Sequence, residues 1–247
     1  LALLSLKKAK YRSGAIRIAH WVDTQFDARA PQGFMGGTFG DQPKPAVNRW
    51  KSTEHNTDLA AAFTQLADVM KDQHWRDRAK ISSAFVAAMW NTQCGCFDAG
   101  MAEDSKARNT TLALDAQIWP MLALAQNGSR RAAVLKILQQ RFTTDGGMAY
   151  SAQKDGVWTE GTLQAALFMA LSGRSAQATA LMAAAEKNRT HDGWYRAANK
   201  KTSTGFDLQT DLKQHRAYFP IPALAPLAWA ALAEQGFNPF TGTKRLP

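Results

Sequence analysis

The chain has 247 residues, of which 45% are hydrophobic and 20% are charged, and its formal net charge at pH 7 is +10. A globular chain of this size buries roughly 70–75% of its unfolded surface, so the composition excludes intrinsic disorder and predicts one sizeable core or at most two small ones. The longest apolar run, 219–233, contains three prolines. No apolar run reaches the length of about 18 residues that a membrane span requires.

Helical periodicity of apolar residues recurs along the chain, for example at Leu59, Phe63, Leu66 and Met70. Apolar residues spaced three or four apart form one face of a helix. We expect helices, in chain order, at 15–26, 59–70, 75–89, 114–125, 134–142, 163–171, 178–185 and 224–232. A truncated helix at the N-terminus brings the number to about nine, and since no segment alternates as a strand does, the sequence predicts an all-α fold.

The connections between these helices are of two kinds. Short ones, at 71–74, 127–129 and 172–175, predict antiparallel helical hairpins. Long ones combine glycine with an aromatic residue, and they begin at Gly33, Gly95, Gly146 and Gly193. We interpret the chain as a degenerate repeat of helical hairpins in a single domain over 1–247. A ring of inner and outer helices, an α/α toroid, is favoured over an open solenoid of the tetratricopeptide kind, whose repeats have tight turns at both ends.

Each of three long loops is followed by a carboxylate, a tryptophan and an amide near the start of a helix. The predicted catalytic carboxylates are Glu54, Asp115 and Glu160. The predicted substrate-binding residues are Trp50, Lys51, His55, Asn56, Asp58, Gln117, Trp158, Gln164, Trp194 and Tyr195. An acid in the first turn of a helix also fits the helix dipole, so Glu54 and Glu160 have a structural alternative. Asp115 lies inside an apolar run, where a buried carboxylate needs a partner or a function.

Paired carboxylates provide the chemistry of glycoside cleavage, because one protonates the leaving oxygen while the other activates water or attacks the anomeric carbon. The sequence has no nucleophile elbow, P-loop, dinucleotide-binding motif or zinc-protease motif. Cys94 and Cys96 are interpreted as loop thiols, since their spacing fits neither a disulfide scaffold nor structural zinc. We therefore predict no metal and no cofactor.

The positive charge is spread along the chain rather than gathered into a nucleic-acid motif. The acid-free run at 130–141 has the spacing of a solvated helix face. We interpret the charge mainly as a basic surface, with an acidic polysaccharide as the next alternative and nucleic acid disfavoured.

Three segments, 50–58, 114–119 and 158–167, together with the alternation of helical hairpins and Gly-aromatic loops, resemble the six-hairpin glycosidase-like superfamily of (α/α)6 toroids. The resemblance implies a sugar-binding central cleft with catalytic acids at the ends of inner helices, and hence an oligo- or polysaccharide partner. About nine helices fall short of a full toroid, and the first residue is Leu1, so we expect an incomplete N-terminal part and assign no compartment. A glycoside hydrolase-like enzyme is the leading hypothesis. A non-catalytic glycan- or protein-binding toroid and a terpene-cyclase-like toroid are the alternatives.

Overall fold

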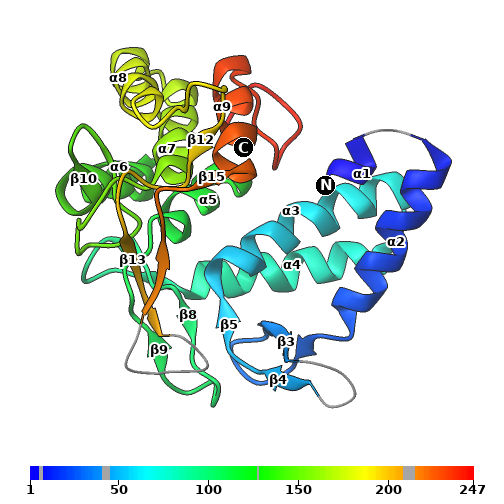
Figure 1. Cartoon of the computed structure of the whole chain (residues 1–247). Coiled ribbons are helices and arrows are strands. Elements are labelled where there is room, and N and C mark those ends of the chain that lie inside the picture. Colours follow the sequence, from blue (N-terminus) through cyan, green and yellow to red (C-terminus); the bar gives the residue numbers. More distant parts are fainter. Residues whose placement is uncertain (6–7, 41–44, 127, 208–214) are drawn as a thin grey trace. The chain divides into compact units, whose positions relative to one another are not determined.

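The computed structural model describes residues 1–5, 8–40, 45–126, 128–207 and 215–247. The chain divides into two compact units (Figure 1). Unit 1 comprises Leu1–Thr92 and Phe97–Thr110, and unit 2 comprises Gln93–Cys96 and Thr111–Pro247. The connection predicted at 127–129 includes Asn127, which lies outside the described residues.

Unit 1 contains four helices and a series of short strands. The helices are α1 (Ala2–Ser5), α2 (Ala9–Asp23), α3 (Thr53–Met70) and α4 (Gln73–Ala88). The strands are β1 (Phe26–Asp27), β2 (Gly33–Phe34), β3 (Gly37–Phe39), β4 (Ala46–Asn48), β5 (Lys51–Ser52), β6 (Trp90–Asn91), β8 (Gly100–Met101) and β9 (Arg108–Asn109). Strand β7 (Cys96–Phe97) lies where the chain passes from one unit to the other.

Helices α3 and α4 form an antiparallel hairpin whose turn is fixed by local hydrogen bonds (Figure 1). Lys71 ends α3 in a left-handed conformation with φ 56°, and Asp72 caps α4 by accepting a hydrogen bond from the His74 amide at 2.8 Å. At the other end of α3, the Ser52 hydroxyl accepts from the His55 amide at 3.2 Å. These two caps set the start of each helix.

The core of unit 1 is built around aromatic rings between α3, α4 and β2. Phe63 lies 5.2 Å from Phe34 and 5.5 Å from Trp75, measured between ring centroids, and all three side chains are buried. Leu66 packs into the same cluster. The apolar positions that predicted a helix at 59–70 therefore face this core.

Unit 2 contains the second set of helices. These are α5 (Asp115–Ala123), α6 (Gly128–Ile137), a π-helical turn at Leu138–Phe142, α7 (Thr159–Leu171), α8 (Ser175–Glu186) and α9 (Leu224–Gln235). The strands are β10 (Thr143–Thr144), β11 (Gly147–Met148), β12 (Tyr195–Arg196), β13 (Thr202–Asp207), β14 (His215–Tyr218) and β15 (Pro222–Ala223).

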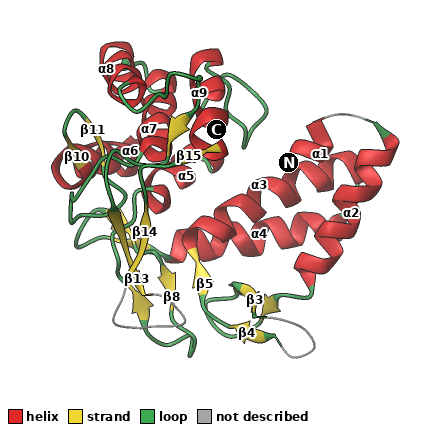
Figure 2. Ribbon diagram, in the orientation of Figure 1, coloured by secondary structure: helices red, strands yellow, loops and turns green. Residues whose placement is uncertain are grey.

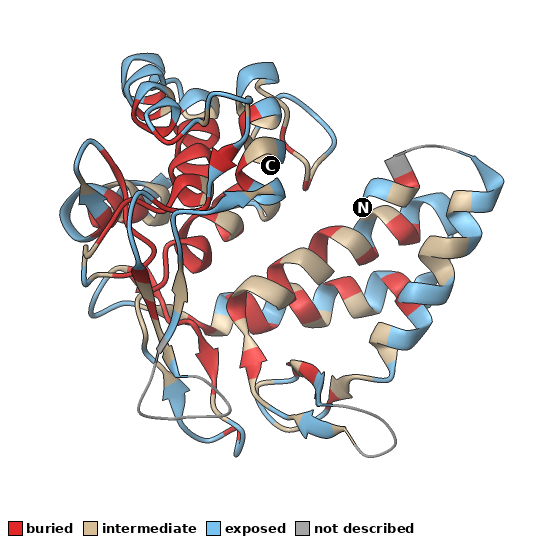
Figure 3. Ribbon diagram, in the orientation of Figure 1, coloured by how far each residue is buried: buried red, intermediate tan, exposed pale blue. Residues whose placement is uncertain are grey.

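Helix α7 is the centre of unit 2, because it packs against α5, α8 and α9. Figure 3 shows it buried along most of its length, and its residues from Gly161 to Met169 are all buried. A helix that is apolar on all sides is a buried helix. Its first turn carries Glu160, one of the predicted acids.

The prediction of an all-α fold is wrong. The described residues include fifteen strands in small sheets of two or three strands, drawn as yellow arrows in Figure 2. Most of them have only two residues, too few to show the alternation that identifies a strand in a sequence. The hairpin of β13 and β14, in which Thr202 pairs with Tyr218, is longer and was missed.

All eight predicted helical segments nevertheless overlap helices of the structure. The boundaries differ mainly at the N-terminal ends, where polar capping residues precede the first apolar position. In the part of the chain that the structure describes, no helix has both the length and the apolar character needed to cross a membrane.

Candidate functional site

The first turn of α7 is held in place by backbone hydrogen bonds from two neighbouring loops. The Trp158 amide donates to the carbonyl of Met148 at 2.8 Å, and the Thr159 amide donates to the carbonyl of Ala197 at 3.0 Å. These bonds connect the start of α7 to two loops, the one that begins at Gly146 and the one that begins at Gly193. The position of Glu160 is consequently set by rigid backbone on both sides.

Glu160 lies in a mostly buried environment with one carboxylate and two hydrogen-bond donors around it. Gln164 Nε2 donates to Glu160 Oε1 at 3.1 Å, and the side chain of Trp229 donates as well. Burial and the charge of Asp115 raise the pKa of Glu160 to about 7, against the opposing effect of the two hydrogen bonds. Glu160 is therefore close to half-protonated at neutral pH.

Asp115 is the first residue of α5 and is only 4% exposed. Its Oδ1 accepts a hydrogen bond from the Ala116 amide at 2.7 Å, which suits a carboxylate at a helix N-terminus. The Leu114 amide donates to the carbonyl of Tyr150 at 2.9 Å, so this end of α5 is fixed to the loop that precedes α7. Unit 2 thus brings two of the three predicted acids, Asp115 and Glu160, into one electrostatically coupled pair.

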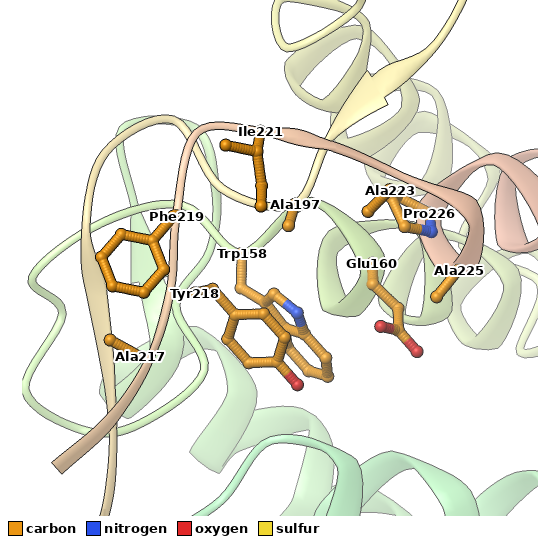
Figure 4. Close-up of a pocket in the computed structure, with 10 residues that line it drawn as sticks. All are labelled: Trp158, Glu160, Ala197, Ala217, Tyr218, Phe219, Ile221, Ala223, Ala225 and Pro226. Atoms are coloured by element: carbon orange, nitrogen blue, oxygen red, sulfur yellow. The ribbon is translucent and has the colours of Figure 1, made fainter.

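A pocket of about 210 Å³ opens beside Glu160 (Figure 4). Besides Glu160 and Tyr218, its lining is apolar: Trp158, Ala197, Ala217, Phe219, Ile221, Ala223, Ala225 and Pro226. Glu160 is the only carboxylic acid among these residues. A mostly apolar pocket with a few polar groups and a perturbed carboxyl group has the character of a ligand site.

Trp158 packs against two tyrosines. Its ring stacks on Tyr218 at 5.2 Å and meets the edge of Tyr150 at 4.8 Å, and the residue is 2% exposed. Its indole nitrogen is buried and has no hydrogen-bond partner within the described residues. Figure 4 shows this nitrogen on the side of the ring that faces Glu160.

The other site residues predicted in unit 2 have different surroundings. Gln117 is fully buried, and its Nε2 donates to the carbonyl of Ala113 at 3.2 Å. Tyr195 donates to Glu186 Oε2 at 2.6 Å, and burial together with this bond raises the pKa of Tyr195 to about 12. Trp194 is 40% exposed. Neither Trp194 nor Tyr195 lines the pocket.

The remaining predicted residues lie in unit 1, at the start of α3. Trp50 and His55 approach each other at 5.4 Å between ring centroids, and burial lowers the pKa of His55, which keeps its imidazole neutral at pH 7. Glu54 and Asp58 are half-buried on the same helix. This group belongs to a different compact unit from Asp115 and Glu160.

Lys51 and Asn56 are fully engaged in holding the fold of unit 1. Lys51 is 1% exposed, and its Nζ donates to the carbonyls of Arg29 and Pro31 at 2.8 Å and pairs with Asp27 at 3.3 Å. Asn56, with no exposed surface, donates to the carbonyl of Phe34 at 3.1 Å and accepts from its amide at 2.9 Å. Both side chains therefore serve the packing of the loops around β2.

Tyr218 and Trp229 contribute to the site and were missed by sequence reasoning. Tyr218 ends β14, which carries no helical period, and Trp229 lies in α9 among apolar residues that resemble ordinary core. For Trp229, the only available signal was the unusual number of tryptophans, eight in the chain.

The interpretation of Cys94 and Cys96 as loop thiols is wrong, because the structure joins them in a disulfide. Gly95 between them has φ 65°, which lets so short a loop close. Among the described residues, no group of three or more His, Cys, Asp or Glu side chains is placed to hold a metal ion.

The sequence matches no family model, and no curated protein matches it. Solved structures do match. A possible member of the GH105 family from Salmonella enterica serovar Paratyphi A has a TM-score of 0.66 and 13% identity, over 95% of this chain and 68% of that one. The cellobiose 2-epimerase from Bacillus thermoamylovorans has a TM-score of 0.62 and 12% identity, over 78% of this chain and 59% of that one.

A D-mannose isomerase has a TM-score of 0.64 and 11% identity, over 95% of this chain and 68% of that one. The chain thus spans between 59% and 68% of the lengths of these three proteins. At such low identity the likeness concerns the fold. That fold, α-helical hairpins joined by loops with short strands, is what the chain shares with these three proteins.

Proposed function

We propose that the chain is a carbohydrate-active domain in which Glu160 acts as a general acid with Asp115 as its carboxylate partner. The observation that carries the proposal is the pair itself: a partly buried Glu160 whose pKa is about 7, interacting electrostatically with the buried Asp115. A carboxyl group with a raised pKa can donate a proton near neutral pH, while its partner remains ionised. These are the two roles that glycoside cleavage requires.

The structural neighbours support a sugar as the substrate. They are a possible member of the GH105 family, a cellobiose 2-epimerase and a D-mannose isomerase. Hydrolysis is our more specific proposal, because unit 2 supplies two interacting acids, Glu160 and Asp115. In that reaction Glu160 gives its proton to the leaving oxygen as the bond from that oxygen to the anomeric carbon breaks, and Asp115 either takes a proton from the attacking water or attacks the anomeric carbon itself before water releases the sugar.

Glu54, predicted as a catalytic carboxylate, and Trp50, His55 and Asp58, predicted to bind substrate, form a second proposed group within unit 1. The neutral imidazole of His55 can accept or donate a hydrogen bond to a sugar hydroxyl. Trp194, with 40% of its surface exposed, is proposed as a stacking surface for a sugar ring.

The test is turnover of a panel of oligosaccharides, polysaccharides, and phenyl and methyl glycosides by the wild-type chain and by the Glu160→Gln and Asp115→Asn variants. Loss of a general acid is expected to reduce kcat about 100-fold or more. Glu234→Gln is the matched control, since it changes an exposed acid of the same unit that lies outside the pocket.

Product analysis separates hydrolysis from isomerisation and epimerisation, because only hydrolysis yields two shorter products. Turnover by Glu160→Gln within about threefold of wild type would overturn the assignment of the acid. Saturable glycan binding with no turnover of any panel member would favour the alternative of a non-catalytic binding domain.

A further inference from the structure

The pocket beside Glu160 is poorly suited to a fully hydroxylated sugar ring. Its lining offers only the Glu160 carboxyl, the Tyr218 hydroxyl and the Trp158 indole N–H as polar side-chain groups. Sugar hydroxyls placed against Ala223, Ala225 or other apolar members would lose their hydrogen bonds to water and gain none. Such unpaired buried groups weaken binding strongly.

The size of the pocket suits a small apolar ring. Its volume is about 210 Å³. An apolar cavity of about 150 Å³ is sufficient to bind benzene. The present pocket therefore has room for an aromatic ring with a short substituent. Phe219 and Ile221, which are 47% and 60% exposed, extend its apolar surface toward solvent.

One hydrogen-bond donor at the edge of the pocket nearest to Glu160 needs an acceptor from the ligand. The Trp158 indole nitrogen is buried, lacks a hydrogen-bond partner within the described part of the chain, and lies on the side of its ring that faces Glu160 (Figure 4). One face of the Trp158 ring is stacked on Tyr218, and the residue is only 2% exposed, so a ligand in the pocket meets the polar edge of the ring. A ligand oxygen close to this N–H and to the Glu160 carboxyl would satisfy the donor.

We propose that this pocket binds an apolar aglycone, an aryl or alkyl group joined to the sugar through an oxygen that lies between Glu160 and Trp158. The substrate class is then a glycoside with an apolar leaving group. The inference rests on the proposed function, because it identifies the linking oxygen with the one that Glu160 protonates. The apolar body of the ligand contacts the alanine and proline side chains at the start of α9.

The first experiment measures binding of anisole, an aromatic ring carrying one ether oxygen, by NMR titration of the folded chain. We expect saturable binding with a Kd on the order of 1 mM. Ala225→Phe, at an exposed position that lines the pocket, is expected to weaken binding about tenfold or more. Ala228→Phe, equally exposed on the same helix but outside the lining, is the matched control and is expected to change Kd less than about twofold.

A second experiment removes the indole N–H. Trp158→Phe is expected to weaken anisole binding about 2- to 10-fold, the range for one neutral hydrogen bond. Trp119→Phe is the control, because its indole nitrogen is also buried and unpartnered within the described residues but does not line the pocket. If Trp158→Phe does not fold, replacement of Trp158 by benzothienylalanine keeps the ring and removes only the donor.

Kinetics provide the third comparison. For any sugar that is turned over, the phenyl glycoside should have a KM about tenfold below that of the methyl glycoside. Equal KM values, no saturable anisole binding, or equal weakening by Ala225→Phe and Ala228→Phe would each overturn the proposal. If anisole binds as described but no glycoside is turned over, the proposed hydrolytic function fails while the apolar pocket stands.

Discussion

Gln164 Nε2 donates a hydrogen bond to Glu160 Oε1 at 3.1 Å from one turn further along α7. The Oε1 atom of the same Gln164 side chain is buried and has no partner within the described residues. The amide thus gives its donor to the acid and leaves its acceptor unused. Since helix geometry fixes residues four apart on one face, Gln164 positions the carboxyl group of Glu160.

Replacement of Gln164 by Leu should raise the pKa of Glu160 above about 7, because the charged carboxylate loses one of its donors. The expected shift is about one pKa unit, which would move the alkaline limb of the pH–activity profile upward by the same amount. Gln177→Leu, at an exposed position on α8, is the control. An unchanged pH profile with lowered activity would mean that Gln164 only supports packing.

Stability should depend on pH through Glu160. The folded chain keeps this proton up to about pH 7, whereas the ordinary pKa of the group is 4.5. Between these values the folded state holds more protons, so the free energy of unfolding falls as pH rises, by up to about 3 kcal/mol. The stabilisation is complete below pH 4.5 and is lost as pH passes the folded pKa.

Urea denaturation of the wild type and of Glu160→Gln across this range measures the effect. The variant cannot ionise at this position, so its stability should vary less with pH and should exceed that of the wild type at about pH 8. Parallel curves for the two proteins would show that Glu160 titrates normally.

Gly161→Ala should damage the site although alanine favours helices. A Cβ at Gly161 would collide with the Trp158 ring and approach Leu114 Cδ2 to 2.6 Å. We expect a loss of about 1–3 kcal/mol in the free energy of unfolding and a drop in activity, because Trp158 must move. Gly128→Ala, which meets nothing within 4 Å, is the control and should be neutral or stabilising. Equal thermal stability of the two variants would contradict the close packing of Trp158.

Asp27→Asn should strongly destabilise unit 1. Burial by itself would raise the pKa of Asp27, but the hydrogen bonds from Arg29 and the charge of Lys51 lower it to about 2. The substitution leaves the Lys51 ammonium buried without its counterion, a change of about 3–5 kcal/mol in the free energy of unfolding.

The same pair predicts acid sensitivity. The lowered pKa of Asp27 contributes stability above its ordinary value of 3.8, and this contribution of about 2 kcal/mol is lost as pH falls toward about 2. Acid denaturation of the wild type and of Asp27→Asn, followed by circular dichroism, measures this loss of stability at low pH. A transition with the same pH dependence in both proteins would exclude Asp27 as its source.

Helix positions could be predicted from the sequence because apolar spacing over two or more turns is a strong signal, as in the segment from Leu59 to Met70. The repeated place after a Gly-aromatic loop selected Glu54, Asp115 and Glu160 alike, and of these Asp115 and Glu160 interact electrostatically within unit 2. Asp115 was the more informative of the two, since a carboxylate within an apolar run rarely lacks a role.

Other features depend on contacts that leave no local pattern. Two-residue strands such as β5 are made by pairing with distant backbone, and Lys51 there is buried through an ion pair with Asp27 that sequence spacing does not reveal. Tyr218 joins the pocket by stacking on Trp158 across 60 positions of sequence. These are tertiary effects that override or ignore local propensity.

The central claim is that Glu160 is a carboxylic acid with a pKa near neutrality because of its burial and of Asp115. The most direct test is a ¹³C NMR titration of the Glu160 side-chain carboxyl carbon, assigned by comparison with Glu160→Gln. The account predicts a midpoint at about 7 in the wild type and a lower midpoint in Asp115→Asn, where the neighbouring charge is gone. A midpoint at the ordinary value of 4.5, unchanged by Asp115→Asn, would contradict it.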